Sequence, residues 1–284
     1  GHHFMFYLIE NNTDLEDLDQ ELLNHKLVAI DTEFRRTSKE NIKLSLIQIN
    51  NDEETFLIDT LVIGECKGNC KFLSSNSVKK IFHSCREDIE ALFSWNKVKI
   101  RNIYDTQLAN EFLGESFSIG YQNLVSKMLG VSIDKKETRS NWIRRPLQES
   151  QLEYAATDVQ FLIRIFEEQV KELEGSSKME WLSEELEFQI NKVFLKKSTE
   201  EYFGVKNSLS KEEEATISIE LAKRVVRTSL RYKVNPTMLF SKKSQKDFIR
   251  NTMKKGFFKA LNDMPRWRKR LLEEDLHNLL GRFS

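Results

Sequence analysis

Segments with a strand-like pattern are confined to the first 105 residues of this 284-residue chain. Apolar or alternating runs occupy residues 6–9, 27–30, 42–50, 54–58, 79–83 and 103–104. Three of these runs, 27–30, 42–50 and 54–58, follow one another in a row, which predicts strands that are at least partly antiparallel. Helical signals separate the others, so the pattern predicts an α/β domain built on a mixed sheet.

Helical signals lie between the strand-like runs and continue alone through the rest of the chain. Capping-box patterns at residues 13–16 and 84–87 predict two helix starts. Further helices are expected at residues 105–113, 120–129, 148–173, 181–196, 212–231, 242–250 and 265–280. We therefore predict an α/β domain over residues 5–173, a helical connector over 174–207, and a small all-α bundle over 208–284.

Charge is divided unevenly along the chain, although 44 Lys and Arg residues balance 44 Asp and Glu residues. Residues 206–284 hold 19 basic and 9 acidic residues, so residues 1–205 carry the matching negative excess. Basic surface attracts phosphate backbones, and clustered carboxylates attract divalent cations. The alternative is that the charge difference between the two halves arose by chance, with the charged residues on solvated helix faces.

Nothing in the sequence indicates export or insertion into a membrane. It contains no apolar run of about 18 residues, and no signal peptide pattern opens it. The three cysteines, Cys66, Cys70 and Cys85, are an odd number without a secretory context, which predicts reduced thiols and a cytoplasmic location. Cys66 and Cys70 have no second Cys/His pair nearby, so a zinc site is disfavoured.

Carboxylates recur beside the predicted strands. Asp31 and Glu33 follow the run at 27–30, and their spacing points both side chains to one face of an extended backbone. Asp88 lies in the helix expected after residue 84, and Asp105 ends the last strand-like run. Two neighbouring carboxylates at the edge of a core repel each other unless a proton or a cation is bound. The pattern therefore favours a divalent metal site.

A further acid lies on the helix expected at 148–173. Tyr154 and Asp158 are four residues apart, which places both on one helix face, and the two alanines between them leave room for close packing.

The acidic positions lie, in order, in the runs LVAIDTEF, IFHSCREDIEALF, YDTQLANEFLG and SNWIRRPLQESQLEYAATDV. Together these runs resemble the DEDD family of 3′→5′ exonucleases. The spacing of Tyr154 and Asp158 resembles the tyrosine branch, and residues 140–159 are most similar to ribonuclease D. The resemblance covers residues 5–170 and implies a ribonuclease H-like fold. Gln148 departs from the pattern, because the family usually starts its last helix with Thr or Ser.

The C-terminal bundle resembles an HRDC-type domain in two places. Val234-Asn235-Pro236 follows one expected helix, and Met264-Pro265-Arg266-Trp267-Arg268 precedes another. Ribonuclease D often carries two such domains, and this chain has room for one clear copy. We expect Trp267 to be a core residue of the bundle.

The family resemblance implies a two-metal site held by Asp31, Glu33, Asp88 and Asp158, with Mg²⁺ or Mn²⁺ as the ions. Asp31 would bridge the two metals, Glu33 and Asp158 would complete the site of the metal that activates water, and Asp88 would act through waters. Tyr154 would orient the attacking water, because its ordinary pKa near 10 makes it a poor general base. Asp105 matches a recurrent family position outside this set.

Several residues near these acids are candidates for substrate contacts. Phe34 could stack on a terminal base or belong to the core. His83 could contact substrate or make a structural hydrogen bond. Arg144 and Arg145 precede the Tyr154 helix and could meet phosphate or be solvated. In the bundle, the stripe Arg224, Arg227 and Arg231 could follow an RNA backbone or form a solvated face.

The resemblance implies an exoribonuclease that trims RNA 3′ ends, such as those of tRNA precursors, releases nucleoside 5′-monophosphates and is a monomer. A DNA-directed 3′→5′ exonuclease and a catalytically silent RNA-binding scaffold are the alternatives. All four acids and the tyrosine are present, which disfavours the scaffold. The chain has no G-x-x-x-x-G-K-[ST] loop, which disfavours a helicase module.

Overall fold

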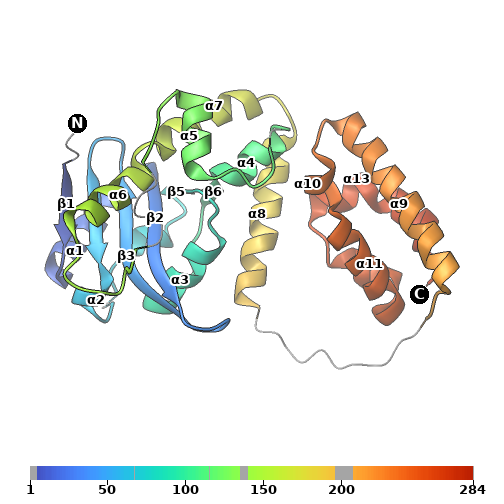
Figure 1. The fold of residues 1–284 in the computed structure, drawn as a ribbon, viewed down its shortest axis with the longest axis horizontal. Helices are drawn as coiled ribbons and strands as arrows, with labels where there is room; N and C mark the ends of the chain where they lie inside the picture. The colour runs from blue at the N-terminus through green and yellow to red at the C-terminus, as the bar shows by residue number, and fades with distance from the viewer. Residues whose placement is uncertain (1–4, 67, 115, 135–139, 196–206, 284) are drawn as a thin grey trace. The chain divides into compact units, whose positions relative to one another are not determined.

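The computed structural model describes residues 5–66, 68–114, 116–134, 140–195 and 207–283 (Figure 1). The chain forms two compact units. The first comprises residues 1–109 and 119–174, and the second comprises residues 110–118 and 175–284. Among the described residues, no helix is both long enough and apolar enough to cross a membrane.

The first unit contains a six-stranded mixed sheet with the strand order β1-β4-β3-β2-β5-β6 (Figure 1). β2 and β4 run antiparallel to β3, whereas β1–β4, β2–β5 and β5–β6 are parallel pairs. The predicted mixed sheet is therefore confirmed. The strands are β1 Phe6–Ile9, β2 Leu27–Arg36, β3 Ile42–Asn50, β4 Thr55–Asp59, β5 Lys79–Phe82 and β6 Ile103–Asp105.

Helices connect the strands and cover the sheet. They are α1 Asn12–Leu22, α2 Thr60–Ile63, α3 Arg86–Asn96, α4 Thr106–Phe112, α5 Tyr121–Leu129, α6 Glu149–Gln160 and α7 Leu162–Leu173, with a 3₁₀ turn at Lys71–Leu73. α6 packs on β3 and β4 through a buried cluster of Leu46, Leu57, Trp142, Ala155 and Ala156. The two alanines let α6 approach the sheet closely, as their size suggests.

Two predicted boundaries beside the acidic residues were wrong. β2 continues six residues beyond the predicted end at residue 30, so Asp31 and Glu33 lie within the strand. The strand continues because its polar residues still pair with β3 along the ladder, Asp31 opposite Gln48 and Glu33 opposite Leu46. The single helix predicted at 148–173 is two helices, α6 and α7, that break at Phe161 (φ −106°, ψ −2°).

Both predicted capping boxes were also wrong. α1 is capped by Asn11, whose side chain accepts a hydrogen bond from the Asp14 N–H at 2.8 Å. At the start of α3, Ser84 has a left-handed backbone (φ 61°) and its side chain does not cap the helix. The N–H groups of Ser84 and Cys85 donate instead to the carboxylate of Asp105 on β6.

The described secondary-structure elements of the second unit are all helices, as predicted for the C-terminal part of the chain, and the end of α4 with Phe112 belongs to it. Its helices are α8 Lys178–Phe194, α9 Lys211–Tyr232, α10 Pro236–Phe240, α11 Lys242–Lys255, α12 Phe257–Asn262 and α13 Arg266–Leu280. α8, predicted as a connector, belongs to this unit. Residues 196–206 of the predicted connector lie outside the described residues.

Trp267 is the centre of the helical unit. Its indole is fully buried, stacks on Trp181 at 5.8 Å between ring centroids, and meets Phe112 edge to face at 5.0 Å. The indole N–H donates to the buried carboxylate of Glu185 at 2.8 Å, and Arg268 donates to the same carboxylate at 3.2 Å. The prediction that Trp267 is a core residue is confirmed.

Candidate active site

Three acidic side chains converge between β2 and α6. One carboxylate oxygen from each of Asp31, Glu33 and Asp158 lies within 4.8 Å of the others. Asp31 and Glu33 point to the same face because they are two residues apart on one strand. Asp158 reaches them from α6, which packs over β2, β3 and β4. These three acids therefore lie close together, as the sequence predicts.

Gln48 on β3 completes the polar surroundings of the cluster. Its amide nitrogen donates to Asp31 at 3.3 Å and to Glu33 at 3.5 Å. Gln48 was not singled out from the sequence. The sequence signal was its place between Ile47 and Ile49 in the strand, where an amide that is buried needs hydrogen-bond partners.

The cluster is electrostatically costly as it stands. Burial, more than any other effect, raises the pKa of Asp31 to about 7. Burial raises the pKa of Glu33 and of Asp158 well above the ordinary range, and repulsion by Asp31 adds to both shifts. Glu33 and Asp158 are thus expensive to ionise while Asp31 is charged. A bound cation would remove this cost.

Two buried oxygens point to the same conclusion. Asp158 Oδ1 and Gln48 Oε1 are both inaccessible to solvent and have no hydrogen-bond partner among the described residues. Buried polar atoms in native proteins normally have a partner, which can be an ion or its coordinated water. Three convergent carboxylates are also the oxygen donors that Mg²⁺ and Mn²⁺ prefer. The residues present therefore fit a divalent metal.

Asp88, the fourth predicted ligand, lies beside this cluster and not within the group of three. It is buried in the first turn of α3, and its carboxylate accepts a hydrogen bond from the Thr32 hydroxyl. Thr32 points to the opposite face of β2 from its neighbours Asp31 and Glu33. Burial, followed by repulsion from Asp31, raises the pKa of Asp88 well above its usual value. Asp88 is therefore close enough to interact electrostatically with Asp31.

Tyr154 lies one helical turn before Asp158 on α6. Its ring packs against Trp142, with 6.1 Å between ring centroids and 33° between the ring planes, beside the buried cluster under α6. The packing fixes the ring on the helix face that also carries Asp158.

Asp105 binds four backbone N–H groups at two helix starts. Oδ1 accepts from Ser84 at 3.0 Å, Gln107 at 2.9 Å and Leu108 at 3.2 Å. Oδ2 accepts from Cys85 at 2.9 Å. These bonds hold the turn before α3 and the first turn of α4 on one carboxylate. Since Asp88 lies in the first turn of α3, Asp105 positions it.

We expect Asp105→Asn to lower the free energy of unfolding by about 2–4 kcal/mol, because an amide cannot accept all four bonds and each charge-assisted bond contributes roughly 1.5–3 kcal/mol. Urea unfolding followed by circular dichroism measures the change. Asp17→Asn on the exposed face of α1 is the matched control and should shift stability by less than about 0.5 kcal/mol. Equal effects of the two substitutions would contradict this role.

His83 makes two hydrogen bonds within the fold. One ring nitrogen, Nδ1, lies 2.8 Å from the Thr106 hydroxyl, and the other, Nε2, lies 2.8 Å from the Ile119 carbonyl oxygen. Burial lowers the pKa of His83, which favours the neutral ring. These contacts are structural hydrogen bonds, which were one of the two roles considered for His83 from the sequence. Phe34 is half-buried on β2 opposite Leu44.

The two arginines before α6 differ sharply. Arg144 is exposed. The Arg145 guanidinium forms a two-pronged ion pair with the buried carboxylate of Asp59, with both N–O distances at 2.9 Å. It also donates to the carbonyl of Trp142 at 2.7 Å, and to the carbonyl and hydroxyl of Ser45 at 3.2 and 3.0 Å. Arg145 therefore ties the loop before α6 to β3 and β4.

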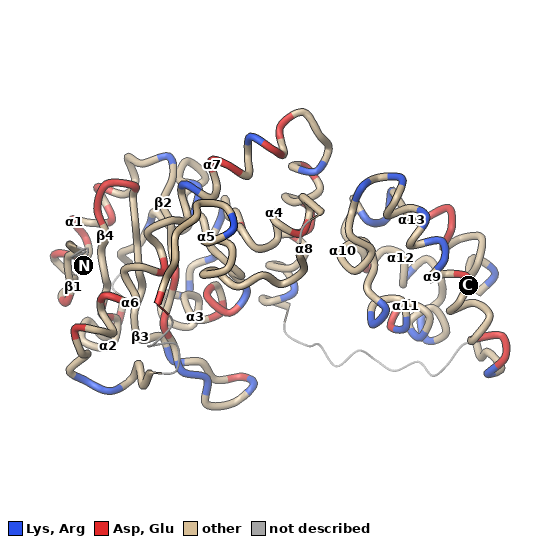
Figure 2. Tube along the Cα trace, turned by 45° about the horizontal axis from the view of Figure 1, so that its top comes forward, with Lys and Arg blue, Asp and Glu red and all other residues tan. Residues whose placement is uncertain are grey.

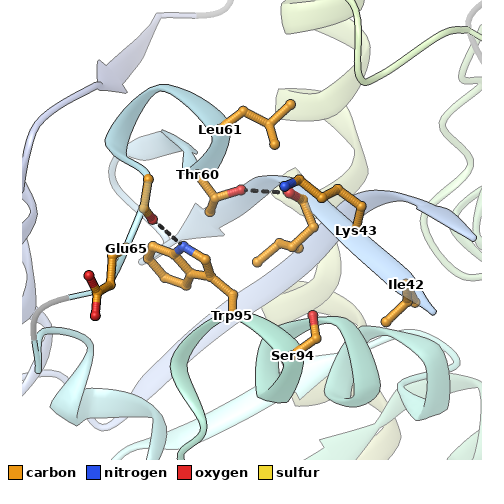
Figure 3. Close-up of a pocket in the computed structure, with 9 residues that line it drawn as sticks. Ile42, Lys43, Thr60, Leu61, Glu65, Ser94 and Trp95 are labelled. Atoms are coloured by element: carbon orange, nitrogen blue, oxygen red, sulfur yellow. Dashed lines mark hydrogen bonds between the residues drawn. The ribbon is translucent and has the colours of Figure 1, made fainter. Parts of the chain in front are cut away.

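A separate cavity of about 340 Å³ lies between the start of β3, α2 and the end of α3 (Figure 3). Its walls include Lys43, Leu44, Thr60 and Trp95, and no member of the acidic cluster lines it. The Trp95 indole donates to the Gly64 carbonyl at 2.7 Å, and the Thr60 hydroxyl donates to the Leu44 carbonyl at 3.0 Å, so these polar groups serve the fold (Figure 3).

A mixed sheet with three carboxylates gathered between β2 and α6 defines an α/β protein with a candidate site for a divalent metal. Comparison with known proteins identifies the family. Residues 6–174 match the family model described as 3′-5′ exonuclease. The chain belongs to this 3′-5′ exonuclease family, whose members use divalent metals.

Among similar proteins, ribonuclease D of a Shewanella species is 33% identical over 181 residues, which are 64% of this chain and 47% of that protein. Ribonuclease D of Haemophilus influenzae is 39% identical over 168 residues, which are 59% of this chain and 42% of that protein. The chain spans about half the length of the curated relatives it matches. The resemblance to ribonuclease D is thus confirmed.

Solved structures support the fold. Escherichia coli RNase D, described as an exoribonuclease involved in structured RNA processing, superimposes with a TM-score of 0.66 at 22% identity, covering 98% of this chain and 75% of that one. Brucella melitensis NrnC bound to pGG gives a TM-score of 0.59 at 25% identity, covering 68% of this chain and 92% of that one. The predicted ribonuclease H-like fold is therefore confirmed.

Proposed function

We propose that this protein is a metal-dependent 3′→5′ exoribonuclease that removes nucleoside 5′-monophosphates one at a time from RNA 3′ ends. The observation that carries the proposal is the cluster of Asp31, Glu33 and Asp158 within an exonuclease-family domain. The names of the similar ribonucleases favour RNA over DNA as the substrate. We propose a cytoplasmic location and the 3′ ends of structured RNAs, such as tRNA precursors, as natural targets.

Asp31, Glu33 and Asp158 would hold the divalent ions, Mg²⁺ or Mn²⁺, with Asp88 contributing through water. Bound in this way, the ions would lower the pKa of a water and offset the charge that develops on the phosphate. Asp31 is central to this set, because its charge helps to raise the pKa of Glu33, Asp158 and Asp88. Gln48 orients the Asp31 and Glu33 carboxylates, and Asp105 holds the start of α3 and with it Asp88.

Tyr154 would orient the attacking water by a hydrogen bond, since an unperturbed phenol is a weak base at neutral pH. Phe34 would stack on the terminal base, and exposed Arg144 would meet a phosphate. For His83 and Arg145, whose polar atoms bind within the fold, we propose positioning roles in place of substrate contact.

We propose that residues 5–173 form the exonuclease domain and that residues 208–284 form an HRDC-like bundle, with α8 of the predicted connector 174–207 belonging to the same helical unit. Within the predicted RNA-binding stripe of α9, Arg227 and Arg231 are exposed. Arg224 instead forms ion pairs with Glu220 at 3.3 Å and Asp275 at 3.4 Å. We therefore propose Arg227 and Arg231 as the residues of this stripe that contact an RNA backbone.

The test is degradation of a 5′-labelled RNA with a single-stranded 3′ tail, in Mg²⁺, Mn²⁺ or EDTA, beside DNA of the same sequence. We expect a ladder that shortens from the 3′ end, requires metal, and forms faster on RNA than on DNA. Preferred cleavage of DNA would support the DNA-directed alternative. Bound but intact RNA in every metal would support the scaffold and overturn the proposal.

A further inference from the structure

An apolar stripe on α9 is exposed on the helical unit. Ile219, Val226 and Leu230 have 60%, 48% and 76% of their surface accessible, which is unusual for large apolar side chains. Exposed Ala215 and half-buried Ala222 lie on the same face. The opposite face of the helix carries the buried Ile217, Leu221 and Val225 that anchor it in the bundle. α9 thus has one apolar face inside the bundle and a second outside it.

The outer stripe has the spacing of a helix-pairing seam. Ala215, Ile219, Ala222, Val226 and Leu230 follow one another at intervals of four, three, four and four residues. Intervals of three and four keep side chains along one line of a helix, where a second helix can interdigitate with them.

The order of residue sizes fits an antiparallel copy of the same helix. If two α9 helices cross with their centres between residues 222 and 223, Ala215 faces Leu230 of the partner subunit. Ile219 then faces Val226 of the partner subunit, and Ala222 faces the aliphatic stem of Lys223 of the partner subunit. Each layer pairs a small or medium side chain with a larger one, which is how packed helices fill space.

Charge favours the same orientation. The first turn of α9 carries Glu212, Glu213 and Glu214, whereas its second half carries basic residues up to Lys233 (Figure 2). An antiparallel pair places the acidic start of each helix beside the basic end of the other. A parallel pair would place like charges together.

We propose that α9 is a self-association surface through which two copies of this chain pair in an antiparallel, two-fold arrangement. The interface is isologous, since the same stripe serves both copies. An interface made by a single pair of helices buries a small area for a specific interface. The dimer should therefore be weak, with a dissociation constant on the order of 10 μM. This differs from the monomer expected from the family resemblance, and it does not depend on the proposed catalytic activity.

Sedimentation velocity of the full chain over about a hundredfold range of concentration tests the proposal. We expect a monomer–dimer equilibrium that Val226→Glu and Leu230→Glu each weaken by at least about tenfold, because each places two carboxylates in an apolar seam. Phe258→Glu is the matched control, since Phe258 is 59% exposed but lies on α12, and it should leave the equilibrium unchanged. Circular dichroism checks that all variants remain folded.

Two further variants test the orientation. Glu212→Lys should weaken the dimer, and adding Lys233→Glu to the same chain should restore it, because the two positions meet only in an antiparallel pair. Mild oxidation should cross-link Ala222→Cys, which lies beside the two-fold axis, and should leave Ala215→Cys uncross-linked. A monomer at every concentration, or equal cross-linking at positions 215 and 222, would overturn the proposal.

Discussion

Asp31→Asn is expected to lower the rate of RNA degradation by about three orders of magnitude at saturating metal. The charge of Asp31 acts on both other cluster carboxylates and on Asp88, so Asp31 is central to the set that would hold the metal, and its loss should weaken metal binding. Metal stabilisation of a phosphoryl transition state contributes several kcal/mol, and each 1.36 kcal/mol corresponds to a factor of ten in rate. Rates of 3′-end trimming on a labelled RNA measure the loss, with Asp17→Asn as the matched exposed control.

The same substitution should lower activity but raise the stability of the metal-free protein near neutral pH. In the folded protein the pKa of Asp31 rises from 3.8 to about 7, so the folded state binds this proton more tightly than the unfolded state does. Stability from such a group is present at low pH and is lost as the pH rises from about 4 to about 7. The metal-free wild type should therefore melt at a lower temperature at about pH 8 than at about pH 5.

Asp31→Asn should reduce that pH dependence, raise the melting temperature in EDTA near neutral pH, and remove most of the stabilisation that added Mn²⁺ gives to the wild type. Differential scanning fluorimetry with and without metal measures all three effects. A variant that keeps wild-type degradation, or that gains as much from Mn²⁺ as the wild type, would show that Asp31 is not a metal ligand.

Arg145→Ala is expected to lower the free energy of unfolding by about 3–5 kcal/mol. Asp59 is buried, and its ion pair with Arg145 is two-pronged, so removing the arginine leaves an uncompensated carboxylate in the interior. The same change releases Ser45 and the Trp142 carbonyl, which connect β3 to the loop before α6. Since α6 carries Tyr154 and Asp158, activity should fall together with stability.

Arg144→Ala provides the matched control, because Arg144 is the adjacent, exposed arginine and should change stability by less than about 0.5 kcal/mol. Adding Asp59→Asn to Arg145→Ala should recover part of the loss, since it removes the unpaired charge. Urea unfolding curves for the four proteins give these differences. If Arg145→Ala weakened RNA binding without loss of stability, the substrate-contact role considered from the sequence would replace the positioning role.

The sheet and the acidic cluster could be predicted because local patterns determine them. The alternation in residues 42–50 matches β3 as observed, and the two-residue spacing of Asp31 and Glu33 places both on one face of a strand. The four-residue spacing of Tyr154 and Asp158 likewise places both residues on one face of α6. Such periodicities depend on backbone geometry alone, which the sequence reveals directly.

What the sequence could not reveal depends on partners far apart in the chain. Ser84 is a plausible local cap for α3, yet the N–H groups of Ser84 and Cys85 just before this helix are bound by Asp105, from a strand further along the chain. The irregular register between Glu33 and Phe34 leaves Ser45 between paired residues, where Arg145, one hundred positions later, binds it. Asp88 has the expected position on its helix, but whether its carboxylate joins the other three depends on how α3 packs against β2.

The most direct test of the catalytic assignment follows the first product released from an RNA labelled at its 3′-terminal nucleotide. We predict that the label leaves as a nucleoside 5′-monophosphate before any shorter RNA accumulates. Its release should require Mg²⁺ or Mn²⁺ and should be absent in Asp158→Asn. Labelled oligonucleotides as first products, or release that persists in EDTA or in the variant, would contradict a 3′→5′ exonuclease centred on this carboxylate cluster.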